Sequence, residues 1–167
     1  MQHRTTLRTS VLLLTLIPSG LAQIPTWRLT DQTSRNEITH LLTTISTNTY
    51  PAADGTLKHA NLQLKCSGTL TSSATISVDP TDTFDVKSDA ITILSIRLDN
   101  ERAIPVGWAN LSLHRILLYD LRDLLPPHHR MSIDLPLASS PTPQTLTFDL
   151  SGLAATMQAN NCRRRLH

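Results

Sequence analysis

Apolar and polar residues alternate along several short segments of this 167-residue chain. The pattern is clearest in ANLQLKC (60–66), AITILSIRL (90–98) and TLTFDL (145–150). A period of two places successive apolar side chains on the same face of a β-strand. Threonine is abundant, and threonine, isoleucine and valine fit the pleated surface of a sheet. The alternation therefore predicts a fold built mainly from short strands.

Turn-forming residues separate these segments and limit how many strands the chain can make. We expect strands within 36–48, 60–66, 74–79, 90–102, 106–112, 130–137 and 145–150. No composition shift or linker divides the chain after residue 22. The sequence therefore predicts a single domain over residues 23–167, an antiparallel β-sandwich or curled sheet of about seven or eight short strands.

Two segments lack the strand alternation and predict short helices instead. The first is RILLYDLRDLLPP (115–127), in which four leucines share a helical stripe before a double proline ends it. These leucines are Leu117, Leu121, Leu124 and Leu125. The second, LAATMQANNC (153–162), follows the turn Ser151-Gly152 and predicts a C-terminal helix. We expect one or two short helices beside the strands.

The first 22 residues have the layout of a secretory signal peptide. Arg4 and Arg8 give a positive start, an apolar run follows at 11–17, and 20–22 offer small residues at the cleavage positions. The run is too short to cross a hydrocarbon core of about 30 Å as a helix. We therefore expect residues 1–22 to be removed and the mature protein to be periplasmic or secreted, without stable membrane insertion.

The net charge argues against nucleic acid as a partner. The whole chain carries +2, and Arg4 and Arg8 contribute +2, so 2 − 2 leaves about zero for the mature chain. A nucleic-acid-binding surface concentrates basic residues to displace counterions from phosphates. The arginines at 163–165 end the chain. We interpret them as a solvated tail, with a docking patch for an acidic partner as the alternative.

Cys66 and Cys162 are the two cysteines of the chain. In an exported protein such a pair predicts a disulfide. Closing a loop of roughly 100 residues would stabilise the fold by about 4 to 5 kcal/mol in the chain-entropy model. Two free thiols are the alternative, and a metal site is less favoured because neither cysteine has a second ligand at metal-binding spacing. A disulfide would also remove Cys66 as a nucleophile.

No motif indicates catalysis, a metal ion or a cofactor. The chain has no G-x-S-x-G, P-loop or H-E-x-x-H motif, and we expect neither catalytic residues nor a cofactor. His128 and His129 are adjacent and would face opposite ways on a strand, so we interpret them as a loop pair rather than as metal ligands. His40 and His114 lie in partly apolar segments and are interpreted as core or edge residues.

Four aspartates and two tryptophans complete the candidate residues. The aspartates are Asp79, Asp82, Asp85 and Asp89. Carboxylates suit calcium, but the EF-hand pattern is absent, so we expect a solvated loop. Trp27 and Trp108 are the largest side chains, and core packing is their default role, with an exposed interaction site as the alternative.

The order of these features along the chain resembles that of one known protein family. A signal peptide is followed by a lone tryptophan, an L-x-L-x-C strand and a strand ending in Arg-Leu-Asp. A second tryptophan segment and an LxxLL end come next, and F-x-L-x-G-L then leads a helix to a terminal cysteine. The positions are Trp27, Leu62, Leu64, Cys66, Arg97, Asp99, Trp108, Phe148, Leu150, Gly152, Leu153 and Cys162. This layout resembles the VasI (TagO-like) type VI secretion system-associated periplasmic proteins, although the segment after Cys66 lacks the aromatic residue that the family tends to carry. The resemblance implies a periplasmic location and no established enzyme activity.

Together these features predict an exported, disulfide-bonded accessory protein that acts through protein–protein contacts with envelope or secretion-apparatus proteins. The resemblance points to a type VI secretion system. The alternative is a periplasmic binding module for a small ligand, glycan or peptide, with Trp27 or Trp108 lining the site. An enzyme such as a cell-wall hydrolase would need clustered carboxylates, histidines or a thiol in a cleft.

Overall fold

The computed structural model describes residues 26–34, 37–66, 74–85, 92–119, 121, 124–160 and 162. The expected signal peptide (1–22) and arginine tail (163–165) lie outside these ranges. The described elements are β1 (Arg28–Ser34), β2 (Glu37–Ile45), β3 (Tyr50–Pro51), β4 (Leu57–Lys58), β5 (Asn61–Cys66), β6 (Ala74–Ser77), β7 (Thr92–Leu98), β8 (Ile104–Ser112), β9 (Arg115–Leu118), β10 (Arg130–Leu135), β11 (Gln144–Asp149) and α1 (Leu153–Ala159).

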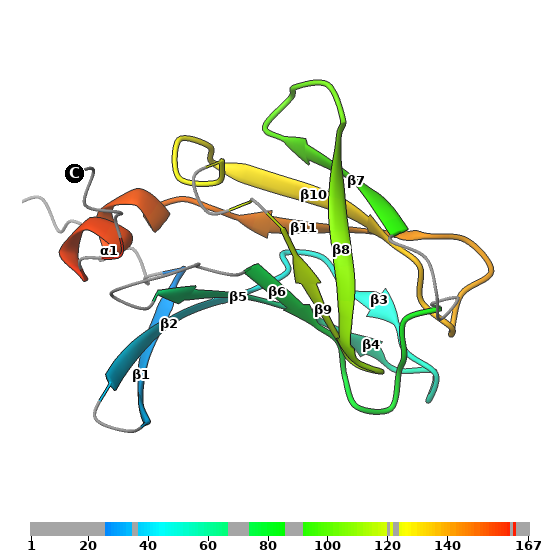
Figure 1. The fold of residues 1–167 in the computed structure, drawn as a ribbon. Helices are drawn as coiled ribbons and strands as arrows, with labels where there is room; N and C mark the ends of the chain where they lie inside the picture. The colour runs from blue at the N-terminus through cyan, green and yellow to red at the C-terminus, as the bar shows by residue number, and fades with distance from the viewer. Residues whose placement is uncertain are drawn as a thin grey trace, which may run out of the picture.

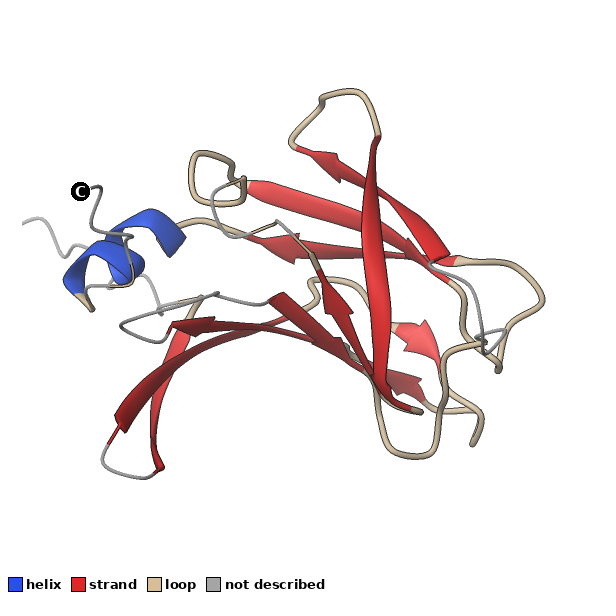
Figure 2. Ribbon diagram, in the orientation of Figure 1, coloured by secondary structure: helices blue, strands red, loops and turns tan. Residues whose placement is uncertain are grey.

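Nine of the strands form one sheet in the order β1-β2-β5-β6-β9-β8-β7-β10-β11, and β3 pairs with β4 in a small second sheet. All these pairs are antiparallel. The large sheet curls until β10 and β11 lie across from β2 and β5, and α1 lies at one end (Figure 1). Strands dominate the molecule (Figure 2). The structure confirms the mainly β prediction and its curled-sheet form.

The curl brings the end of β2 against the last strand, β11. Ser46 pairs with Phe148 in an antiparallel bridge. The backbone N–H of Thr47 donates to the carbonyl oxygen of Thr147 at 2.7 Å. The side-chain oxygen of Asn48 accepts the N–H of Thr147 at 2.8 Å. These bonds occupy the outer edge of β11 and join it to the residues that follow β2, so the curled sheet encloses its apolar face.

Alternation along the strands sorts side chains between this enclosed face and the outer face. In β5, Leu62, Leu64 and Cys66 are buried, while the residues between them are partly or fully exposed. Ile133 of β10 and Phe148 of β11 have no exposed surface. The buried hydrophobic residues form a single cluster, as expected for one domain with one core.

The expected helix over 115–127 is wrong in its first half. Arg115–Leu118 form β9, which pairs with β6 on one side and with β8 on the other. Ile116 and Leu118 are buried in the core, whereas Leu117 between them is partly exposed. A short apolar run fits both a helical and a strand period. Here β6 and β8 lie on either side of the segment and both need a hydrogen-bonding partner, so the segment forms a strand.

The second half of that segment buries its leucines through a turn. The N–H of Leu125 donates to the carbonyl oxygen of Leu121 at 3.0 Å, and both residues are buried. Leu124 is partly buried and packs against the core. The stripe therefore identifies two core residues correctly, although the described part of the segment contains no helix.

α1 confirms the predicted C-terminal helix. Gly152 adopts a positive φ of 79°, which only glycine reaches without strain, and it turns the chain from β11 into the helix. The Asp149 carboxylate accepts the N–H of Ser151 at 2.8 Å and supports the same turn. Leu153 and Met157 are buried against the core. The helix thus covers one end of the curled sheet.

The alternation pattern does not predict β1, β3 or β4. β1 has the polar sequence RLTDQTS, and its residues 28–33 are exposed on both faces. β3 and β4 contain two residues each and lie between the expected strands in 36–48 and 60–66. β1 has no buried face, and two residues are too few to show a period of two.

The strand assignment of β9 makes a testable prediction. Ile116→Ala should lower the free energy of unfolding by about 2 to 4 kcal/mol, because it empties a fully buried site. Leu117→Ala is the matched control and should cost less than about 1 kcal/mol, because that side chain lies on the outer face. Urea denaturation measures both values. A larger loss at Leu117 than at Ile116 would contradict the strand.

Candidate functional site

A disulfide joins Cys66, the last residue of β5, to Cys162, which follows α1. Their Cα atoms lie 5.2 Å apart, and 96 positions separate them in the sequence. This is the pairing expected from the sequence. Each cysteine is only 3% exposed. The N–H of Cys162 donates to the carbonyl oxygen of Met157 at 2.9 Å, so the bond ties the end of α1 to the end of β5.

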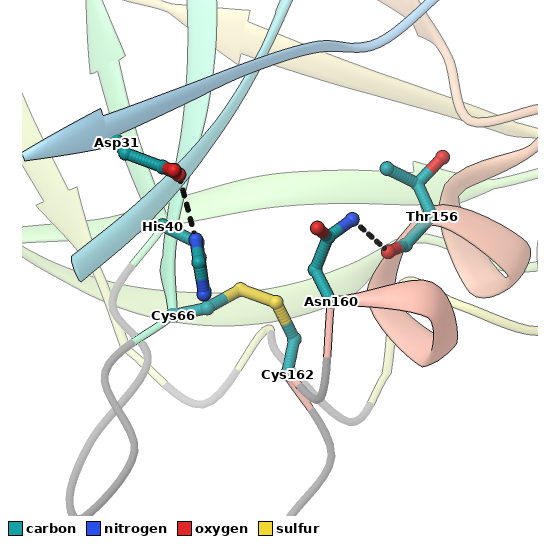
Figure 3. The surroundings of a disulfide bond; sticks show 6 residues. All are labelled: Asp31, His40, Cys66, Thr156, Asn160 and Cys162. Atoms are coloured by element: carbon teal, nitrogen blue, oxygen red, sulfur yellow. Dashed lines mark hydrogen bonds and ion pairs between the residues drawn. A yellow bond between two sulfur atoms is a disulfide. The ribbon is translucent and has the colours of Figure 1, made fainter. Parts of the chain in front are cut away.

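Asp31, His40 and Cys66 lie in a row beside this bond. The strand register places Asp31 of β1 opposite His40 of β2, and His40 opposite Cys66 of β5. Residues directly opposite one another in antiparallel strands project from the same face. The distance from His40 Nδ1 to Asp31 Oδ1 is 2.7 Å. Figure 3 shows the other ring nitrogen of His40 pointing toward the disulfide.

The row connects solvent with a buried sulfur atom. The Asp31 side chain is 55% exposed and the His40 side chain is 31% exposed, whereas Cys66 is buried. The imidazole ring is therefore held on one side by a carboxylate and faces the disulfide on the other. From the sequence, His40 is predicted only as a core or edge residue, and nothing in the sequence pairs it with Asp31.

β1 forms an open edge of the large sheet next to this row. Among the described strands it pairs only with β2, over all seven of its residues and without a bulge. It contains neither proline nor lysine, the residues that commonly protect an edge strand from pairing. Leu29 on β1 is 41% exposed and Ile38 on β2 is 55% exposed. The register places both on the face that carries His40.

Hydrogen bonds near the end of β2 identify the backbone groups at this edge. The N–H of Ser46 donates toward the β5 side and the N–H of Thr47 donates to β11, on the other side of β2. Residues along a strand alternate in the side to which their N–H and C=O groups point. The odd-numbered residues of β2 therefore bond to β1. By the register, Leu29, Asp31 and Thr33 of β1 direct their backbone groups to the free edge.

Trp27 and Trp108 both lie in the core, which is the default role predicted for them, and not in an exposed interaction site. Trp27 is 4% exposed and Trp108 is 3% exposed, and the Trp108 ring lies 6.4 Å from that of Phe84. The indole Nε1 of each tryptophan and the hydroxyl of Thr44 are buried without a hydrogen-bond partner among the described residues. A buried indole N–H usually finds an acceptor. These three groups are therefore capable of binding an acceptor atom.

His128 and His129 lie in the loop before β10, and Asp99 organises that loop. Asp99 adopts a positive φ of 49° at the turn after β7. Its carboxylate accepts the backbone N–H groups of His129 and Arg130 at 2.9 Å each, and His128 Nδ1 lies 3.0 Å from its other oxygen. Burial alone would raise the pKa of Asp99, but these hydrogen bonds outweigh it and lower the pKa below the usual range. These contacts give Asp99 a structural role, because its carboxylate fixes the loop before β10 to the turn after β7.

The four spaced aspartates do not form one solvated loop. Asp82 is 1% exposed and its carboxylate accepts the hydroxyl of Ser139 at 2.8 Å, so the expectation of a solvated residue is wrong there. His114 bonds through Nδ1 to the carbonyl oxygen of Asp82. Asp85 is exposed, while Asp89 lies outside the described residues.

Asp79, the first of these aspartates, caps its own turn. Its carboxylate accepts the N–H of Thr81 at 3.0 Å and the Thr81 hydroxyl at 2.7 Å. These hydrogen bonds lower the pKa of Asp79. Lys58 Nζ lies 3.4 Å from the same carboxylate. Over the described ranges, no group of three or more His, Cys, Asp or Glu residues is arranged to hold a metal ion.

Comparison with family models, with curated proteins and with solved structures finds no match to this chain. In the part of the chain that the structure describes, no helix is long and apolar enough to span a bilayer. The disulfide and the β-rich fold are shown by the structure alone.

Removing the disulfide should destabilise the fold strongly. The double variant Cys66→Ala/Cys162→Ala should lose about 4 kcal/mol of unfolding free energy, because the unfolded chain regains the freedom of a long loop. Urea denaturation with and without dithiothreitol measures the effect. The wild type should lose a similar amount in dithiothreitol, and the double variant should be insensitive to it. Equal stability of all four samples would show that the bond contributes nothing to the fold.

Proposed function

We propose that this is an exported accessory protein that acts through contacts with other envelope proteins, and that β1 makes these contacts by accepting a strand of the partner. The observation that carries the proposal is the open edge of β1. Strand addition uses the unpaired backbone groups of an edge for affinity and the alternating side chains beside it for specificity.

The contrast between the two edge strands supports this role. The chain covers the edge of β11 with its own residues 46–48. The edge of β1 has no comparable cover among the described residues, and Leu29 and Ile38 add exposed apolar surface beside it. A partner strand at β1 would extend the sheet and bury these two side chains.

The sequence and the disulfide support export. A signal-peptide layout at residues 1–22 precedes the domain. A disulfide between distant parts of a chain is typical of the periplasm and of secreted proteins. We therefore propose a periplasmic or secreted location. The association with a type VI secretion system rests on the resemblance to the VasI (TagO-like) proteins, and a gene neighbourhood without secretion components would count against it.

A second candidate function is the binding of a small ligand in the core. One observation favours it: the indole N–H groups of Trp27 and Trp108 are buried without an acceptor among the described residues. A ligand with carbonyl, carboxylate or hydroxyl oxygens would supply one. This candidate ranks below the first, because burial of both indoles also fits simple core packing.

The strand-addition proposal predicts a difference between two substitutions of one residue. Thr33→Pro removes an edge-facing N–H and should lower the affinity for a β1-binding partner at least about tenfold. Thr33→Ala keeps the N–H and should bind like the wild type. The measurement is affinity capture from an envelope extract by immobilised protein, followed by titration of the captured protein. Equal retention on both variants would exclude strand addition at β1.

The ligand-binding candidate predicts a change in tryptophan fluorescence. Titration with cell-wall glycan fragments, short peptides and small carboxylates should shift the emission, because an acceptor at the indole N–H alters its environment. The shift should disappear in Trp27→Phe or in Trp108→Phe, which identifies the tryptophan involved. The absence of a shift throughout the panel would remove the support for this candidate.

A further inference from the structure

We propose that the strand accepted by β1 runs antiparallel to it and carries, in order, a basic residue, any residue, an apolar residue and an acidic residue. The basic side chain lies opposite Asp31, the apolar one opposite Leu29 and the acidic one opposite Arg28. This inference rests on the proposed strand addition at β1 and names the chemistry of the partner strand. Its basis is the way in which rows of side chains across the sheet end at β1.

One apolar row on the enclosed face of the sheet ends exposed at β1. From Leu29, the register leads through directly opposed positions on the neighbouring strands to five further apolar side chains, Leu42, Leu64, Ala74, Leu118 and Trp108. Those five are at most 3% exposed, whereas Leu29 is 41% exposed. An apolar side chain opposite Leu29 on an added strand would continue the row and remove this surface from water.

The next row on the same face ends in a negative charge. Asp31 lies two positions along β1 from Leu29, and its side chain is 55% exposed. Within the described residues, the hydrogen-bonding partner of its carboxylate is His40, which contacts Oδ1 (Figure 3). The other oxygen is thus available toward the free edge. Because opposite charges in directly opposed positions stabilise a strand pair, we expect lysine or arginine opposite Asp31.

Arg28 places a positive charge on the other face of the same strand. Its side chain is exposed, and it has no ion pair with another described residue. Thr43, directly opposite it on β2, is uncharged. An aspartate or glutamate opposite Arg28 on the added strand would supply the missing counter-charge.

Antiparallel addition determines the order of these side chains along the partner. All strand pairs of the large sheet are antiparallel, so an antiparallel partner extends the existing pattern. From its own N-terminus, such a strand meets in turn Asp31, Thr30, Leu29 and Arg28. Thr30 is exposed and uncharged, and it leaves the position opposite it unrestricted. A parallel strand would need the reverse order.

Three end-blocked peptides of identical composition test this order. In the matched peptide, TTKTVE, the lysine faces Asp31 and the glutamate faces Arg28. The exchanged peptide, TTETVK, interchanges these two charges, and the reversed peptide, EVTKTT, fits a parallel arrangement. Each is titrated into isotope-labelled protein, and the NMR shifts of the backbone amides of Leu29 and Thr33 report both the site and the dissociation constant. The matched peptide should bind about fivefold more tightly than the exchanged peptide.

A charge exchange within β1 should invert this preference. Arg28→Glu/Asp31→Lys leaves the net charge unchanged and should make the exchanged peptide the tighter ligand by about the same factor. The matched control is Arg97→Asp/Asp134→Arg, which exchanges the charges of an ion pair between β7 and β10. This control also keeps the net charge and should retain the order of affinities seen for the wild type.

The outcomes separate this inference from the function on which it rests. Equal affinities of the wild type for the matched and exchanged peptides, with the β1 amides shifting in both titrations, would overturn the partner chemistry but leave strand addition at β1 intact. A preference that the charge exchange in β1 does not invert would do the same. Tightest binding of the reversed peptide would overturn the antiparallel order. If no peptide shifts the β1 amides, this inference and strand addition at β1 are both wrong.

Discussion

The fold depends on the hydrogen bonds by which residues 46–48 join β2 to β11. Without them the nine-stranded sheet would be open, and its apolar face would meet water along one side. With them the sheet returns on itself, so that inward side chains from opposite strands share one core. The disulfide and α1 then cover one end of this enclosure. Burial of apolar surface drives folding, but here a few backbone bonds determine which surface can be buried.

The disulfide joins β5 to the segment after α1, and both of its cysteines are buried. The Asp31–His40 pair lies in the same cross-strand row as Cys66. The register thus places β2 directly beside the end of β5 at which the covalent bond is made.

The sequence predicts those parts of the fold that have one buried face. Leu62, Leu64 and Cys66 alternate with polar residues, and β5 follows from that period. β9 is missed because its leucines also fit a helical stripe, and only the flanking strands decide between the two. β1 is missed because it is exposed on both faces and has no periodic signal. The cysteine pairing was predictable because there are only two cysteines, whereas the Asp31–His40 contact depends on a hairpin register that the sequence does not reveal.

The placement of β1 and β11 along the same side of β2 has a consequence for how the protein can evolve. β1 occupies that side up to Thr43, and the contact with β11 begins at Ser46. The β1–β2 pairing and the closing contact with β11 thus use successive stretches of the chain instead of competing for the same stretch. Substitutions in β1 can therefore change the edge proposed for a partner while the closing bonds stay intact, so this surface can diverge in evolution without loss of the fold.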